Sequence, residues 1–121
     1  MRYLIPIGRV LFALIFIMAA PRHFTHEGVQ HAAELGLPAA GVLVPISGII
    51  ALLGALSVAT GYKLRWGAWM LVAFLVPVTL VMHAFWRLHD APAIHVQQAM
   101  FAKNLSMLGA ALLITQLPGK S

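Results

Sequence analysis

The stretch that decides the fold is AGVLVPISGIIALLGALSVATGYKLRWGAWMLVAFLVPVTLVMHAFW, residues 40–86. It holds two long, largely apolar runs, 40–60 and 66–86, joined by the short polar segment GYKLR. A run of about 20 apolar residues is what an α-helix needs to cross the hydrocarbon of a bilayer. Because the connection is short, the sequence predicts two antiparallel membrane-spanning helices that lie side by side.

The composition supports a membrane location. Of the 121 residues, 61% are hydrophobic and only 9% are charged, whereas an average soluble domain carries about 25% charged residues. A chain this short and this poor in charge cannot cover a water-facing surface. We therefore expect the lipid bilayer to be its main partner.

Two further apolar runs flank the central pair. They cover about 3–20 and 96–117 and are followed by Pro21 and by Pro118–Gly119, which are ordinary helix terminators. Backbone groups in lipid must be bonded internally, and nothing alternates like a barrel strand. The sequence therefore predicts one all-α domain over 1–121, a bundle of four transmembrane helices.

The N-terminal run also has the charge and apolar pattern of a signal peptide, with Ala19 and Ala20 as small residues suited to cleavage. We predict an uncleaved first span instead, because Arg9 lies within the run and more spans follow.

The segment between the first two spans contains HEGVQHAAELGLP, residues 26–38. On a helix, its apolar and polar residues separate onto two faces: Val29, Ala32, Ala33 and Leu37 against Glu27, Gln30 and Glu34. This pattern predicts a short amphipathic helix at the membrane interface.

The charges indicate an orientation. The net charge is +5, but the basic residues form no stripe with interleaved aromatics, so we expect no nucleic-acid partner. Near the span ends, one side holds Arg2, Lys63, Arg65 and Lys120. The other side holds Arg22, Arg87 and Lys103. This bias favours a multi-pass protein of the cell (inner) membrane with both termini in the cytoplasm.

Arg9 lies within the first span, where a charge is costly unless it snorkels or finds a partner. Its position within the span makes Arg9 a candidate for a direct role in chemistry. We favour a structural role, in which it snorkels to the cytoplasmic side or bonds polar groups of other spans, namely Thr60, Thr115 or Gln116.

Four residues suggest a ligand pocket near the outer ends of spans three and four. His83 and Trp86 are three residues apart and would share a helix face, and Asn104 lies about two turns into span four. A quinone ring needs aromatic walls and one or two donors. The hypothesis is that His83, Trp86, Phe101 and Asn104 form a quinone headgroup pocket in the outer leaflet. The alternative is that His83 faces lipid headgroups while Asn104 bonds a neighbouring helix.

Metal and haem sites are less well supported. His23 and His26 have the spacing of a ligand pair, but no acidic or thiolate ligand is fixed beside them, so we predict no metal. Bis-histidine haem needs two histidines at matched depth inside the bundle, and His83 is the one suited to that position, with His23 at its margin. The absence of cysteine excludes disulfides, thiol relays and iron–sulfur ligation by this chain.

Several pieces in the same order resemble the DoxX family of small four-span membrane proteins. They are GRVLFALIF (8–16), AAELGLP (32–38), SGIIALLGALSVATGYKLRWGA (47–68), HAFW (83–86) and FAKNLSMLGAALL (101–113). Many members continue the first span with a glycine and a lysine; this chain has AAPRHF (19–24), so Arg22 matches that lysine only loosely. By resemblance, the recurrent polar positions are Arg9, His83, Trp86, Lys103 and Asn104.

The resemblance implies a membrane subunit of a quinone-linked oxidoreductase, like the subunit of an archaeal thiosulfate:quinone oxidoreductase, or a membrane partner of soluble redox enzymes. It assigns no catalytic residue, and the chain has no nucleophile–base pair of its own. The alternative is a non-enzymatic homo-oligomer that scaffolds partners or moves a small solute.

Overall fold

The computed structural model describes residues 2–118, which contain helices and no β-strand. The α-helices are α1 (Leu4–Ala19), α2 (His26–Glu34), α3 (Ala40–Thr60), α4 (Leu64–Met82) and α5 (Ala91–Ile114). Two 3₁₀-helices, η1 (Ala20–Phe24) and η2 (Phe85–Arg87), follow α1 and α4. The predicted all-α class is confirmed.

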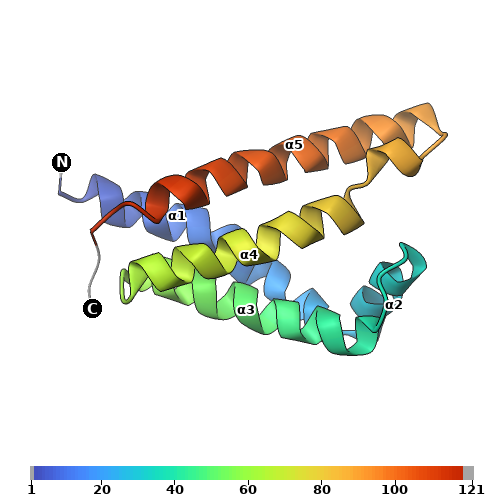
Figure 1. Cartoon of the computed structure of the whole chain (residues 1–121). Coiled ribbons are helices and arrows are strands. Elements are labelled where there is room, and N and C mark those ends of the chain that lie inside the picture. The colour runs from blue at the N-terminus through green and yellow to red at the C-terminus, as the bar shows by residue number, and fades with distance from the viewer. Residues whose placement is uncertain (1, 119–121) are drawn as a thin grey trace.

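Figure 1 shows how these helices are arranged. Both ends of the described chain lie at one end of the bundle, which we call the terminal end. Helix α2 and the α4–α5 connection lie at the other, which we call the open end. Helix α3 packs against α1, α2 and α4, while α5 packs mainly against α4.

Within the described residues, three segments are long and apolar enough to cross a membrane: Leu4–Phe24, Ala40–Thr60 and Leu64–Arg87. They coincide with the first three predicted spans. Helix α5 has 24 residues, but its polar residues Gln97, Gln98, Lys103 and Asn104 lower its hydropathy. The fourth predicted span is therefore not confirmed. Lys120, used to orient the chain, lies outside the described residues.

Near the α4–α5 connection, the ends of the α-helices differ from the ends of the predicted spans for local reasons. Helix α4 stops at Met82 rather than at residue 86, because the Phe85 N–H bonds the His83 carbonyl at 2.9 Å. This places Ala84 (φ −78°, ψ 71°) at the centre of an inverse γ-turn. Trp86 therefore does not continue the helical face of His83. Helix α5 begins at Ala91 rather than near residue 96, because the Asp90 carboxylate accepts from the Ala93 N–H at 3.1 Å and Pro92 suits the first turn.

The first span also ends later than predicted, since η1 continues it to Phe24 beyond Pro21. Helix α2 forms where the amphipathic segment was predicted. The Thr25 side chain caps it by accepting from the Gly28 N–H at 3.1 Å. Ala32 is buried, and the polar face with Glu27 and Glu34 is exposed.

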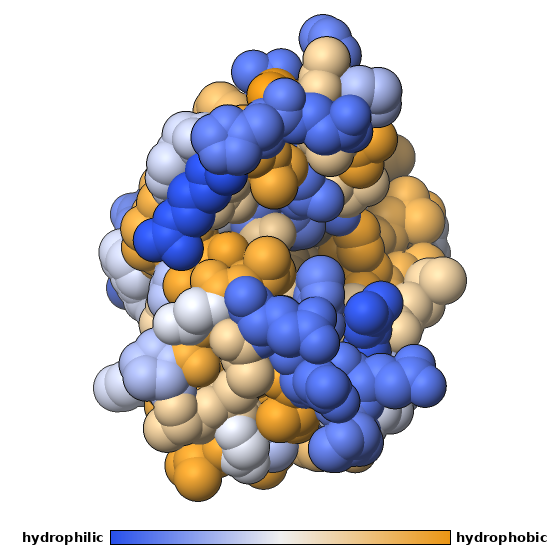
Figure 2. All heavy atoms as spheres, turned by 90° about the vertical axis from the view of Figure 1, so that its right-hand side faces the viewer, coloured by the Kyte–Doolittle hydropathy of each residue, from blue (hydrophilic) through white to orange (hydrophobic). Residues whose placement is uncertain are grey.

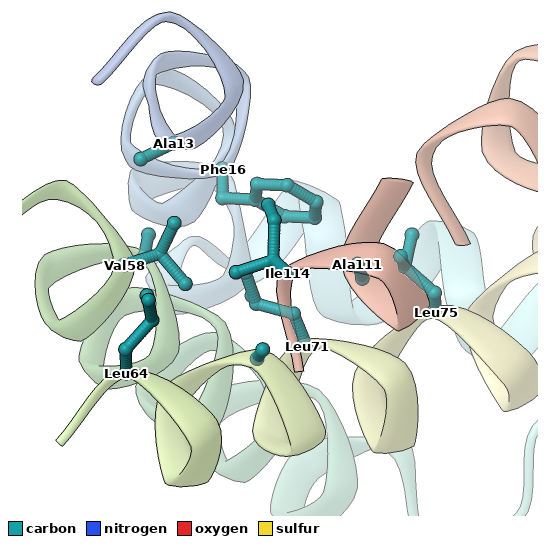
Figure 3. Close-up of a cluster of buried hydrophobic side chains, with 10 residues drawn as sticks. Ala13, Phe16, Val58, Leu64, Leu71, Leu75, Ala111 and Ile114 are labelled. Carbon is teal, nitrogen blue, oxygen red and sulfur yellow. The ribbon is translucent and has the colours of Figure 1, made fainter. Parts of the chain in front are cut away.

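The close-packed core occupies the terminal end. Figure 3 shows Phe16 of α1, Val58 of α3, Leu71 of α4 and Ile114 of α5 converging there. Small residues on α3 allow close approach, since a methyl group on Gly54 would lie 3.0 Å from the Gly67 carbonyl oxygen of α4. Close approach of this kind is what small residues between membrane helices allow. At the open end, a smaller buried cluster of Ala32, Ala40 and Val44 packs α2 on α3 beside a cleft.

Candidate functional site

A cleft of about 590 Å³ lies between α3 and α4 and is bordered by η1, α2 and one residue of α5. Along α4 it runs from Ala73 to His83, which corresponds to about 15 Å of helix. Its walls are mostly apolar, with Ile46, Ile50, Phe74 and Val78 among them. Figure 2 views the open end, where hydrophilic residues gather in an upper and a lower group with apolar residues exposed between them.

The ionisable side chains that line the cleft are all basic. Among the described residues, its lining contains five basic side chains and no Asp or Glu: Arg22, His23, His31, His83 and Lys103. Ser47 adds a hydroxyl. These residues come from η1, α2, α3, α5 and the end of α4, so they meet only in the folded chain.

His23 packs against α3 at Gly48, which has no side chain to keep the two segments apart. A methyl group on Gly48 would lie 2.5 Å from the His23 Cβ, so only glycine admits the histidine at this distance. The His23 ring packs on Phe74, with centroids 5.5 Å apart. His23 Nδ1 lies 3.2 Å from Ser47 Oγ.

The hydrogen bonds of Ser47 favour one tautomer of His23. When the Ser47 hydroxyl donates to the Val44 carbonyl, which lies at 2.7 Å, it has no second hydrogen for the ring. In this arrangement His23 Nδ1–H donates to Ser47 Oγ. In the neutral ring, Nε2 is then an acceptor.

His83 has a matching arrangement. Its Nδ1 lies 2.8 Å from Oε1 of Gln97, at the beginning of α5. An amide oxygen only accepts, so Nδ1 carries the hydrogen and Nε2 of the neutral ring is an acceptor. The cleft thus has two half-buried imidazoles whose Nδ1 atoms are both engaged by the protein.

The other predicted pocket residues lie away from the cleft. Asn104 is 4% exposed and donates to Thr79 Oγ1 at 3.0 Å within the α4–α5 interface. Trp86 and Phe101 pack edge to face, with centroids 5.8 Å apart, and each also contacts Phe85. The structure therefore brings His83 to the cleft, whereas Asn104 joins α5 to α4 and the contact of Trp86 with Phe101 joins η2 to α5.

Arg9 lies over the C-terminal end of α3. Its Nη1 would be 2.5 Å from a methyl group on Gly61, the residue that caps α3. A cation at this position faces the carbonyl end of the helix, where the backbone dipole favours positive charge. Its Nε is buried and has no hydrogen-bond partner among the described residues. Within those residues, the hydrogen bonds of Thr60, Thr115 and Gln116 do not involve Arg9.

The predicted histidine pair is split. His23 lines the cleft, whereas His26 begins α2 on the exposed surface and is not part of the lining. Within residues 2–118, no three His, Asp or Glu side chains lie close enough to hold a metal ion together.

Sequence reasoning did not place five residues at the site. Four of them line the cleft, namely Arg22, His31, Ser47 and Lys103, and the fifth, Gln97, contacts His83. One signal was available for Gln97. In both pairs, His83–Gln97 and Thr79–Asn104, one residue precedes Asp90 and the other follows it at a similar distance along the chain. Residues at similar distances from the α4–α5 turn therefore contact each other between the two helices. The other contacts join segments far apart in sequence and left no such signal.

The comparisons with known proteins give one match. The sequence pattern described as DoxX matches residues 4–84, from the start of α1 to just beyond α4. No curated protein and no solved structure matches the chain.

Proposed function

The chain belongs to the DoxX family and is an integral membrane protein, and from that premise we propose that it is a subunit or anchor of a quinone-linked oxidoreductase. In this proposal α5 is the fourth span and α2 lies at the outer interface. Both termini are cytoplasmic, in the cell (inner) membrane. Residues 2 and 118 lie at the same end of the bundle, as an even number of crossings requires.

The observation that carries the proposal is the apolar cleft with His23 and His83 on its lining. Its volume lies within the range of about 300–1,000 Å³ typical of small-molecule sites. A neutral imidazole Nε2 accepts a hydrogen bond from a hydroquinone hydroxyl, and a protonated one donates to a quinone carbonyl. The two rings therefore fit either form of a quinone headgroup, which would supply two-electron, two-proton chemistry when bound.

The remaining predicted site residues have supporting roles in this proposal. The Thr79–Asn104 bond holds α5 on α4, and the cluster of Phe85, Trp86 and Phe101 holds it on η2. They thereby hold Gln97 where it orients the His83 ring. We propose neither haem nor metal. A soluble redox partner, as electron donor, would dock on a water-facing end of the bundle.

Quinone retention tests the proposal. The full chain, purified in mild detergent, is extracted with organic solvent, and quinone is measured by reduced-minus-oxidised absorbance. We expect His83→Ala and His23→Ala to lose most of the bound quinone. His95→Ala is the matched control, because His95 is exposed on α5 and does not line the cleft. A quinone-free wild-type protein, or equal retention in all four proteins, contradicts the proposal.

One observation favours the alternative, a non-enzymatic homo-oligomer that scaffolds partners or moves a small solute. Helix α5 packs mainly on α4, and a methyl group on Gly109 would meet nothing within 4 Å. This face of α5 has room for another helix. A stable homo-oligomer without quinone, measured by light scattering of the detergent-solubilised protein, would support the alternative over the oxidoreductase subunit.

A further inference from the structure

The cleft has a charge pattern that a quinone does not explain. A quinone ring is uncharged, yet the cleft carries Arg22 and Lys103 with no carboxylate among its described lining residues. Within the described residues, the side-chain contact of Lys103 Nζ is the Met100 sulfur at 3.6 Å, and a thioether is a weak acceptor. Both cations therefore lack a protein anion in the cleft.

With α5 as the fourth span, as proposed above, the position of Lys103 makes this costly. Lys103 adjoins Asn104, whose bond to Thr79 places this part of α5 about one turn inside the C-terminal end of α4. A charge at that depth in a membrane helix faces a water-filled cavity or pairs with an opposite charge. Here it faces the cleft.

Arg22 is held in place at the other side of the cleft. Its carbonyl accepts from the Thr25 hydroxyl at 2.8 Å and from the Thr25 N–H at 3.2 Å. Its Cγ would lie 3.2 Å from a methyl group on Gly28, so the stem of the side chain packs against α2. The guanidinium is thus carried by an ordered segment at the end of the first span.

The shape of the cleft indicates the rest of the ligand. A small free anion would need polar donors on several sides, whereas most of this lining is apolar. The walls formed by Ile46, Ile50 and Val78 suit a hydrocarbon chain lying along α3 and α4. Cationic side chains and a long apolar groove together match an amphiphile with an anionic headgroup.

We propose that the cleft binds an anionic phospholipid, with its phosphate held by Arg22 and Lys103 and an acyl chain along α3 and α4. This goes beyond quinone binding and does not depend on it. Because both amphiphiles would enter the same groove, the phospholipid would also compete with a quinone for the cleft.

Native mass spectrometry of the full chain in detergent tests the proposal. Three probes are added separately: phosphatidylglycerol, phosphatidylcholine with identical acyl chains, and inorganic phosphate. We expect the wild-type protein to retain phosphatidylglycerol about tenfold better than phosphatidylcholine, as charge-assisted hydrogen bonds to one headgroup allow. Arg22→Gln and Lys103→Gln should each lose most of this preference, while Lys103→Arg should keep it. Arg65→Gln is the control, because Arg65 is an exposed cation in the first turn of α4, outside the cleft lining.

Three results would overturn the proposal. Equal retention of the two lipids by the wild-type protein would show that the cleft does not prefer an anionic headgroup. This result does not depend on whether any variant folds. An equal loss of the preference for phosphatidylglycerol in Arg65→Gln would show that the net charge of the protein, and not the cleft, causes the preference. Binding of inorganic phosphate as tight as that of phosphatidylglycerol shows that the acyl chain contributes nothing and that the ligand is a free anion.

Discussion

Thr79 and Asn104 are joined by a hydrogen bond of 3.0 Å between Oγ1 and Nδ2, with both residues at most 5% exposed. One helical turn further along α4, His83 and Gln97 are joined at 2.8 Å. These two bonds lie at successive levels of the α4–α5 interface. They set the register of α5 on α4, and with it the orientation of the one predicted pocket residue that lines the cleft.

Breaking the buried bond should weaken the bundle. We expect Asn104→Leu or Thr79→Val to lower the free energy of unfolding by about 0.6–2 kcal/mol, the range measured for bonds between membrane helices. Reversible unfolding in mixed detergent micelles measures it. The double variant should cost less than the sum of the two single variants, because the bond can be lost only once. Strict additivity would show that the two side chains do not interact.

Gly48 should resist even the smallest side chain. A methyl group there would lie 2.5 Å from the His23 Cβ, so Gly48→Ala must displace η1 from α3. We expect a loss of about 1–3 kcal/mol, typical of overpacking. The matched control is Gly109→Ala, a helical glycine beside open space, which should be neutral or stabilising by up to about 1 kcal/mol. Equal melting temperatures for the two variants would mean that η1 is not packed on α3 in this way.

Arg9 should matter for assembly rather than chemistry. Arg9→Leu removes the cation that lies over the C-terminal end of α3, at Gly61. We expect a lower yield of folded protein and a loss of roughly 0.3–2 kcal/mol, the range for a charge at a helix end. Size-exclusion profiles and melting temperatures report both. Normal yield and stability together with lost quinone retention would point to a direct functional role instead.

The topology can be tested with reporter fusions. Gly61 belongs to the connection between α3 and α4, whereas Pro92 lies in the first turn of α5 at the open end. We expect fusions after Gly61 and Ser121 to report the cytoplasm and a fusion near Pro92 to report the outside. A periplasmic signal after Ser121 would mean that α5 does not cross the membrane.

The sequence by itself determined the helical class, three segments that are long and apolar enough to cross a membrane, the short helix after the first of them, and the family. Each follows from local quantities. Run length and hydropathy decide whether a segment can cross lipid, and a backbone in lipid must bond to itself.

The tertiary structure alone decided which polar residues meet. Spacing put His83 and Asn104 at similar depth, but the direction of a side chain depends on the rotation of its helix, about 100° per residue. Helix α4 ends at Met82, and the turn at Ala84 breaks the helical phase, so Trp86 does not share the face of His83. The cleft joins Arg22, His31 and Lys103 from three separate segments. Such a site depends on how whole helices pack against one another, and no local pattern in the sequence encodes that.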